Sequence, residues 1–250
     1  MLAPVTQDPA RSGIFLDVDG TLAPIVGRAE DARVPQETSQ LLGRLARRYG
    51  CVACISGRAA AEARRLVGVG AIAYAGSHGA ELLEPGGASP TVLPAFAEWA
   101  PRVREFAAAR DERDLRLLRV RIEDKGPIVA LHWRGVPDEE AARARLEAVA
   151  QEAEAEGLWT HWGRKVLEIR PPVEVNKGQA VAELAGRYDL RAALYAGDDA
   201  TDLDAFDALD ALPAAVRVGI DSSEGPAAIV QRADLVVEGP EGLAAVLEAL

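Results

Sequence analysis

The sequence predicts an α/β protein, built on a doubly wound, Rossmann-like parallel sheet with a smaller α+β domain inserted into it. Strand-like and helix-like segments alternate at both ends of the 250-residue chain, a pattern typical of βαβ units. Polar clusters follow several of these strands, and the middle of the chain carries a hairpin signal instead. The length suits one large domain, or one domain with an insertion.

The outer blocks carry the strand and helix signals in alternation. An apolar run that begins at Ile14 ends in two acids and then a glycine, which predicts a buried strand over 13–18 that runs into a turn. Residues 35–49 have the spacing of an amphipathic helix. In order, we expect a strand at 13–18, helix 35–49, strand 51–55, helix 58–67, strand 71–75, helix 177–188, strand 192–196, helix 201–209, strand 215–219, helix 225–231, strand 234–237 and helix 240–249.

The middle block predicts an antiparallel sheet. Two β-rich runs are joined by Asp124-Lys125-Gly126, which is the strongest hairpin signal in the chain. In order, we expect strands at 116–123 and 127–134, a helix at 138–156, and strands at 158–162 and 165–169, before Pro171-Pro172 ends the block. The core is therefore expected over 1–96 and 173–250, with 97–172 as the inserted domain.

The composition limits the classes of function. The chain has 28 Lys+Arg against 39 Asp+Glu and a net charge of -11, which argues against nucleic acid as a partner, because phosphate backbones need a basic face. An anionic substrate must therefore meet a metal ion or local cations. The sequence shows no signal peptide and no apolar run long enough to span a membrane. We expect a cytoplasmic protein with no membrane partner.

Cys51 and Cys54 match a CxxC pattern, but the pattern favours core packing. Both lie in the predicted strand 51–55, where residues three apart point to opposite faces. A redox pair would sit at a helix start, and one CxxC cannot supply four zinc ligands.

The run Ile14-Phe15-Leu16-Asp17-Val18-Asp19-Gly20-Thr21-Leu22 is the most informative stretch. Two carboxylates at the end of a buried strand are costly unless they are paired or bind a cation. They suit Mg²⁺, and one of them is placed to act as a nucleophile. Leu22 occupies the position at which a calcium loop needs glycine. The structural alternative is a turn in which Asp19 bonds its own backbone.

Further polar clusters follow other predicted strands. They are Ser56-Gly57-Arg58, Ser77-His78-Gly79 and Gly197-Asp198-Asp199. Ligands of open α/β sheets bind at the carboxyl ends of the strands, so we expect these clusters to share one edge. Ser56 and Gly57 at a helix start suit an anion, although a serine N-cap is the alternative.

Two clusters carry charge that needs a partner. Lys177 begins a predicted helix, where a cation is unfavourable unless an anion offsets it; a solvated lysine is the alternative. Asp198, Asp199 and Asp202 are close together, and their repulsion is relieved by a shared cation. Asp198 is the preferred metal ligand and Asp202 a weaker ligand or a supporting group, although Asp199 or Thr201 could simply cap the next helix.

Together these clusters provide a nucleophile, an acid/base, a phosphate cradle, a cation and a metal site, which phosphoryl transfer requires. Their order resembles the haloacid dehalogenase-like phosphatases over the whole chain, with the middle block in the place of a C2-type cap. Within that superfamily, the sequence resembles the trehalose-6-phosphate phosphatases. The stretches that carry this resemblance are Gly76-Ser77-His78-Gly79-Ala80-Glu81, Glu123-Asp124-Lys125, His132-Trp133-Arg134, the run 163–178, and 197–206.

The resemblance implies the catalytic roles. Asp17 would attack phosphorus and Asp19 would act as acid and then base. Mg²⁺ would be held by the Asp17 carboxylate, the Asp19 carbonyl and Asp198, with Asp202 in support. The phosphate would be bound by Ser56, the N–H of Gly57, and Lys177. The family usually has an acid in place of Leu203 and often tyrosine in place of Trp133.

The resemblance also assigns sugar recognition to the inserted domain. Glu123, Lys125 and Glu168 would bind sugar hydroxyls, and weaker candidates for substrate binding are Arg58, His78 and Arg134. An exposed strand face is the alternative for Glu123 and Glu168, and a structural histidine for His78. Trp133, Trp159 and Trp162 could stack on sugar rings, but aromatic residues on strands are more often core.

The expected function is thus Mg²⁺-dependent hydrolysis of trehalose 6-phosphate, a small-molecule sugar phosphate, in trehalose biosynthesis. Functional pairing with a trehalose-6-phosphate synthase is left open. Alternatives are a phosphatase for sucrose phosphate or mannosyl-3-phosphoglycerate, a phosphomutase, or a sugar-phosphate sensor. A phosphomutase would release no free phosphate, and a sensor would not need both Asp17 and Asp19.

Overall fold

The computed structural model describes residues 1–26, 31–110, 113–163, 165–222 and 225–250. The chain divides into two compact units: the first comprises Met1–Thr91 and Val175–Leu250, and the second Val92–Glu174. The insertion predicted over 97–172 falls inside the second unit. No helix in the described residues is both long and apolar enough to cross a membrane.

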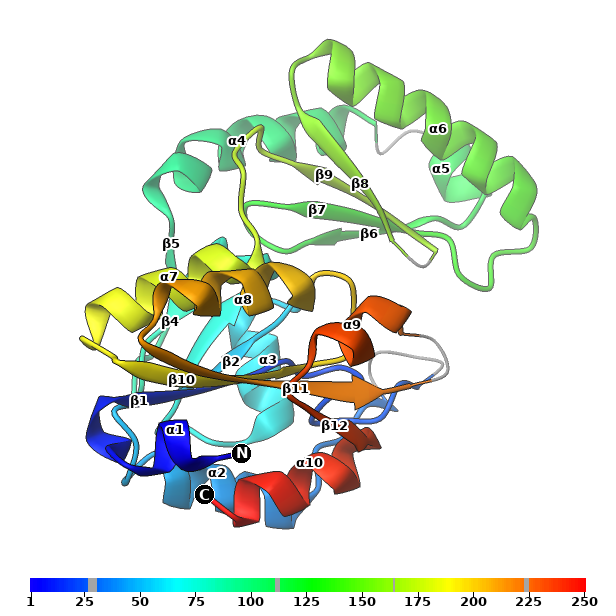
Figure 1. The fold of residues 1–250 in the computed structure, drawn as a ribbon. Coiled ribbons are helices and arrows are strands. Elements are labelled where there is room, and N and C mark those ends of the chain that lie inside the picture. Colours follow the sequence, from blue (N-terminus) through cyan, green and yellow to red (C-terminus); the bar gives the residue numbers. More distant parts are fainter. Residues whose placement is uncertain (27–30, 111–112, 164, 223–224) are drawn as a thin grey trace. The chain divides into compact units, whose positions relative to one another are not determined.

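An eight-stranded sheet forms the centre of the first unit in its described residues (Figure 1). The strand order is β12-β11-β10-β1-β2-β3-β4-β5, and the pairs from β12 through β3 are parallel. β4 joins β3 in antiparallel orientation. The strands are β1 (Ser12–Leu16), β2 (Cys51–Ile55), β3 (Ala73–Gly76), β4 (Glu81–Leu83), β5 (Thr91–Val92), β10 (Ala192–Gly197), β11 (Ala214–Asp221) and β12 (Leu235–Glu238).

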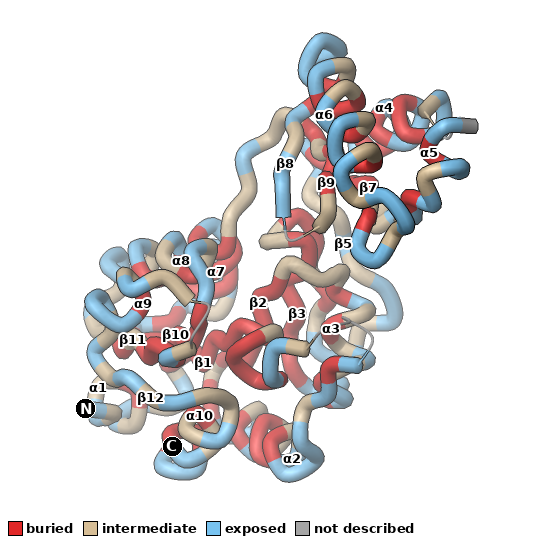
Figure 2. Tube along the Cα trace, turned by 90° about the vertical axis from the view of Figure 1, so that its right-hand side faces the viewer, coloured by how far each residue is buried: buried red, intermediate tan, exposed pale blue. Residues whose placement is uncertain are grey.

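Helices cover both faces of this sheet, so its central strands are buried throughout (Figures 1 and 2). Leu16 packs on the side of α2 and α10, and Phe15 packs on the side of α7 and α8, because successive strand residues point to opposite faces. Burial on both faces explains the continuous apolar runs of β1 and β2. The helices are α1 (Ala3–Thr6), α2 (Gln36–Leu45), α3 (Ala60–Val67), α7 (Lys177–Arg187), α8 (Asp202–Ala208), α9 (Ala227–Arg232) and α10 (Gly239–Glu248).

The two cysteines behave as the strand pattern predicts. Cys51 packs into the core on one face of the sheet and Cys54 into the core on the other, and both thiols are free and buried. Burial raises the pKa of Cys51 to about 12, so this thiol remains protonated at neutral pH.

The second unit contains a four-stranded antiparallel sheet in the order β6-β7-β9-β8. Val129, Leu131, Leu167 and Ile169 face a core formed with its helices, which lie on one side of the sheet (Figure 1). The elements are α4 (Pro94–Ala109), α5 (Arg113–Leu117), β6 (Arg121–Asp124), β7 (Val129–His132), α6 (Glu139–Ala155), β8 (Trp159–Gly163) and β9 (Val166–Arg170).

The predicted elements of the outer blocks are all present, with ends that differ by a few residues. Three elements were not predicted: the short strands β4 and β5, which belong to the eight-stranded sheet, and the helix α4 of the second unit. The strand expected over 116–123 was wrong in its first half: residues 116–117 end the helix α5, and the strand begins at Arg121. Arg119 turns the chain between them at a φ of 58°.

Candidate active site

The carboxyl ends of four adjacent parallel strands bring the predicted polar clusters to one edge of the sheet. β10, β1, β2 and β3 are neighbours in that order. Asp17 follows β1, Ser56 follows β2, Ser77 follows β3 and Asp198 follows β10. The prediction that these clusters share an edge is therefore confirmed.

Lys177 lies between two buried carboxylates. It is the first residue of α7, and its Nζ donates to Asp17 Oδ1 and to Asp202 Oδ1, at 2.7 Å in each case. Lys177 is 3% exposed, so the solvated alternative is excluded. Asn176 caps the same helix by accepting a hydrogen bond from the N–H of Gln179 at 2.9 Å, which fixes the backbone from which the lysine extends.

Asp202 has a carboxylate that is fully occupied by hydrogen bonds. Tyr195 Oη donates to its Oδ1 at 2.6 Å, beside Lys177. The N–H groups of Asp198 and Asp199 donate to its Oδ2 at 2.9 and 2.8 Å. Asp202 therefore orders both the lysine and the loop that carries Asp198.

Asp198 lies beside the turn that follows β1. Thr21 Oγ1 donates to its Oδ1 at 3.0 Å. Gly20 has a φ of +91°, and a Cβ there would lie 2.1 Å from Asp198 Oδ2. Only glycine combines this left-handed backbone with such a close approach. Gly20 is therefore required for the acid to reach the site.

The buried acids carry more negative charge than Lys177 balances. Oxygen atoms of Asp17, Asp198 and Asp202 all lie within 4.8 Å of one another. Burial raises the pKa of Asp17 well above its usual range, although Lys177 opposes this shift. Burial and the charge of Asp202 raise the pKa of Asp198 to about 6. Three carboxylates and one ammonium fit a hard divalent cation, which would restore the balance of charge.

Asp19 is held from the side by Arg58. The Nε of Arg58 donates to Asp19 Oδ2 at 2.6 Å, and its Nη2 donates to Oδ1 at 2.7 Å. Glu62 accepts a further hydrogen bond from the same guanidinium. Arg58, which the sequence suggested as a substrate ligand, thus contacts the predicted acid/base directly.

The segment around Ser56 differs from the predicted anion site at a helix start. The helix α3 begins at Ala60 rather than residue 58, and the N–H of Ala60 donates to Glu81 at 2.7 Å. Ser56 Oγ accepts a hydrogen bond from the N–H of Arg58 at 3.2 Å. A Cβ at Gly57 would lie 2.8 Å from His78 Nε2, so the histidine ring packs against this glycine. His78 itself has a φ of 60°.

The second unit groups three of the predicted sugar-binding residues on one face of its sheet. Lys125 Nζ donates to Glu168 Oε1 at 3.1 Å, and Glu168 also accepts from Arg170. Burial alone would raise the pKa of Glu168, but the charges of Arg170 and Lys125 outweigh it and lower that pKa to about 2. Glu123 lies nearby on β6, with its Oε2 at 2.7 Å from His132 Nε2. Arg134 is exposed beyond the end of β7.

Several residues of the site were not predicted from the sequence. Tyr195 and Thr21 hydrogen-bond the acids, whereas Glu62 and Glu81 fix Arg58 and the start of α3. Tyr195 lies inside an apolar strand, and only its polar hydroxyl in a buried run gives a signal. Glu81 lies in the stretch 76–81, which carries part of the family resemblance, but nothing in the sequence shows that it caps α3.

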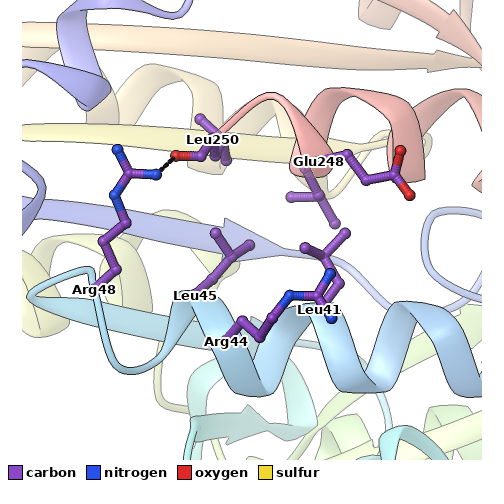
Figure 3. Close-up of a pocket in the computed structure, with 7 residues that line it drawn as sticks. Leu41, Arg44, Leu45, Arg48, Glu248 and Leu250 are labelled. Carbon is purple, nitrogen blue, oxygen red and sulfur yellow. Dashed lines mark hydrogen bonds between the residues drawn. The ribbon is translucent and has the colours of Figure 1, made fainter.

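A cavity of about 250 Å³ lies elsewhere, between α2 and α10 (Figure 3). Its lining includes Leu41 and Leu45 from α2, and Arg48 donates to the main-chain oxygen of Leu250 there. None of the residues that line it belongs to the polar clusters. This cavity is therefore separate from the acidic site.

Comparisons with known proteins identify related sequences. A trehalose-phosphatase family model matches residues 15–232. A trehalose-phosphate phosphatase of Mycolicibacterium paratuberculosis is 36% identical over 236 residues, which are 86% of this chain and 57% of that protein. An uncharacterized glycosyl hydrolase of Mycobacterium tuberculosis is 38% identical over 216 residues, which are 80% of this chain and 15% of that protein. The chain thus spans only part of the length of these curated relatives.

Comparison with solved structures identifies proteins that share this fold. A trehalose-6-phosphate phosphatase related protein superimposes with a TM-score of 0.74 at 26% identity, covering 95% of this chain and 96% of the other. The C-terminal domain of a Candida albicans trehalose-6-phosphate phosphatase gives a TM-score of 0.72 at 22% identity, with 99% and 94% covered. The fold is that of haloacid dehalogenase-like hydrolases.

Proposed function

We propose that this chain, which belongs to the trehalose-phosphatase family, hydrolyses trehalose 6-phosphate to trehalose and phosphate in a Mg²⁺-dependent reaction. The observation that carries the proposal is the contact between Asp17, at the end of β1, and the buried Lys177. A nucleophile beside a fixed cation is the arrangement that phosphoryl transfer needs.

Asp17 would attack the phosphorus atom and form an aspartyl phosphate as the bond from phosphorus to the sugar oxygen breaks. Asp19 would give a proton to that oxygen, because an alkoxide is a poor leaving group. Water would then attack the phosphorus and lose a proton to Asp19. The bond from phosphorus to Asp17 would break, which releases phosphate and restores both acids.

The metal site is formed by residues of the first unit. We assign the side-chain ligands to Asp17 and Asp198, with the main-chain carbonyl of Asp19 as a third. Asp202 supports them, because its oxygens already accept four hydrogen bonds. Mg²⁺, when bound, draws negative charge from the phosphoryl oxygens.

The phosphate would be bound by the Ser56 hydroxyl, the N–H of Gly57 and Lys177. Two observations support this role: Ser56 and Gly57 follow β2 at the carboxyl edge of the sheet, and Lys177 contacts Asp17 from the start of α7. The lysine would shift part of its hydrogen bonding from Asp17 to the phosphoryl group as the new bond forms. Fixed donors of this kind stabilise charge that develops in the transition state.

Sugar recognition would belong to the second unit. Glu123, Lys125 and Glu168 present a mixture of acceptors and donors that suits a ring of hydroxyl groups. Arg134 and His78 are retained as weaker candidates, and Arg58 is assigned to Asp19 instead because of its two hydrogen bonds with that carboxylate.

The test is phosphate release from trehalose 6-phosphate, sucrose 6-phosphate, glucose 6-phosphate and mannosyl-3-phosphoglycerate, with Mg²⁺ and then with EDTA. We expect release that EDTA abolishes and that strongly favours trehalose 6-phosphate. Preference for another substrate would overturn the assigned sugar. Formation of an isomer without free phosphate would indicate a phosphomutase.

A further inference from the structure

The sheet of the second unit has one face against its helices and one face that carries charged groups. Val129, Leu131, Leu167 and Ile169 point to the helices, so their strand neighbours point the other way. We call this second surface the polar face. It carries Glu123, Ala130, His132, Glu168, Arg170, Trp159 and His161. Six of these residues form the pairs Glu123↔Ala130, Ala130↔Glu168, His161↔Glu168 and Trp159↔Arg170, and His132 contacts Glu123.

Trp159 is a large apolar side chain on this polar face. It is 49% exposed and belongs to β8, one of the two edge strands of the sheet, which is exposed over most of its length (Figure 2). Its partner across the strands is Arg170, and directly paired side chains on one face lie about 5 Å apart at Cβ. Glu168 lies on the same face, one pair further along.

Trp162, on the same strand, packs on the opposite side of the sheet from Trp159. It pairs with Leu167, a core residue, and therefore points to the helix side. Its ring meets the buried Trp133 edge to face, with centroids 5.6 Å apart. Both of these tryptophans are thus engaged in packing, whereas Trp159 lies beside ion-paired polar groups.

We propose that Trp159 is an aromatic platform on which a sugar ring of the substrate packs. A sugar ring has an apolar C–H face and a rim of hydroxyl groups. The indole would take the apolar face, and Glu168 with its partners Lys125 and Arg170 would take hydroxyls on the rim. Ala130 leaves space between Glu123 and Glu168, because its side chain is a single methyl group. This inference rests on the proposed function.

The experiment compares Trp159→Ala, Trp159→Phe and the control Trp162→Ala in the full chain. For each variant, kcat/KM is measured with the sugar phosphate that the unchanged protein prefers in the panel above, and with p-nitrophenyl phosphate, which has no sugar. Trehalose binding is measured separately by calorimetry. We expect Trp159→Ala to lower kcat/KM for the sugar phosphate by about tenfold, mainly through KM, and to weaken trehalose binding by a similar factor. Trp159→Phe should keep most of the kcat/KM for the sugar phosphate and most of the affinity for trehalose, because phenylalanine retains an aromatic ring.

The outcomes separate this inference from the proposed function. Unchanged kcat/KM for the sugar phosphate in Trp159→Ala, or an equal loss with p-nitrophenyl phosphate, would overturn the platform. So would the same effect from Trp162→Ala. If the unchanged protein prefers another sugar phosphate, the assigned substrate is wrong. The ratio of kcat/KM between Trp159→Ala and the unchanged protein, measured with that preferred substrate, still decides the role of Trp159. If it prefers no sugar phosphate over p-nitrophenyl phosphate, both proposals fall.

Discussion

The guanidinium of Arg58 holds the carboxylate of Asp19 by two hydrogen bonds, from Nε to Oδ2 at 2.6 Å and from Nη2 to Oδ1 at 2.7 Å. Glu62 holds the same guanidinium from α3. The side chain of Arg58 is 10% exposed, whereas that of Asp19 is 42% exposed. The buried partner thus fixes the orientation of the exposed one.

Arg58→Lys should lower kcat more than it raises KM. Lysine keeps the charge but cannot form the two-pronged contact, so Asp19 would lose its orientation. We expect kcat to fall about tenfold with little change in KM. In a double-mutant cycle with Asp19→Asn, the two losses should be non-additive by about 1 kcal/mol or more. A large rise in KM, or additive losses, would instead make Arg58 a substrate ligand. Arg65→Lys on the exposed side of α3 is the control.

Tyr195→Phe tests the support given to Asp202. The change removes one hydroxyl that donates to a buried carboxylate and keeps the ring against Phe206. We expect a loss of about 2 kcal/mol in the free energy of unfolding, measured with urea. Tyr188→Phe is the matched control, because its hydroxyl bonds the more exposed Glu84. Equal losses in the two variants would show that the buried hydrogen bond of Tyr195 stabilises the fold no more than the more exposed one of Tyr188.

Gly20→Ala tests the turn that lets the carboxylate of Asp198 approach the backbone closely. A methyl group there would meet Asp198 Oδ2, on a backbone at a φ of +91°. We expect a loss of stability of about 1–3 kcal/mol and a higher Mg²⁺ concentration for half-maximal activity. The control is Gly43→Ala in α2, where a Cβ meets nothing within 4 Å. This change should instead raise the free energy of unfolding by up to about 1 kcal/mol. Normal Mg²⁺ dependence in Gly20→Ala would contradict the role of this glycine.

Glu168 should make the second unit sensitive to acid. Its pKa is about 2 in the folded protein against 4.5 for the free group, so the folded state favours the charged form. The resulting stability is fully present above pH 4.5 and is lost as the pH falls toward about 2; it amounts to up to about 3 kcal/mol. Glu168→Gln should be less stable than the unchanged protein at pH 7, and the difference should shrink at pH 3.

Urea unfolding at the two pH values measures this difference. Glu147→Gln, at an exposed ion pair with Arg143, removes the same charge and should show little change at either pH. A difference for Glu168→Gln that is independent of pH would show that the stabilisation does not come from its charge.

Much of the fold follows from local pattern. Apolar runs buried on two faces predicted the central strands, and β2 occupies the predicted residues 51–55. The helix α4 was missed because Pro101 interrupts its pattern, although Phe96, Ala100, Val103 and Ala107 keep helical spacing on its buried side. The turn at Arg119 could not be predicted, because a positive φ at a residue other than glycine leaves no mark in the sequence.

The site could be predicted where reactive polar side chains directly follow a strand, as for Asp17 and Asp198. Contacts between distant segments could not be predicted: Lys177 meets Asp17 across 160 positions, and Thr21 meets Asp198 across 177. The helix start at Ala60 was misjudged because its first N–H donates to Glu81, 21 positions away. Such pairs depend on the order of strands in the sheet, which spacing alone does not determine.

The nucleophilic role of Asp17 is tested most directly by trapping phosphate on this residue. The protein would be mixed with trehalose 6-phosphate labelled in its phosphoryl group, quenched in acid and digested, and the peptide that contains Asp17 would be examined by mass spectrometry. We predict a labelled aspartate in the unchanged protein, and no label and no phosphate release in Asp17→Asn, whose fold should persist. Phosphate release by Asp17→Asn, or turnover with a label on another residue, would show that Asp17 is not the nucleophile.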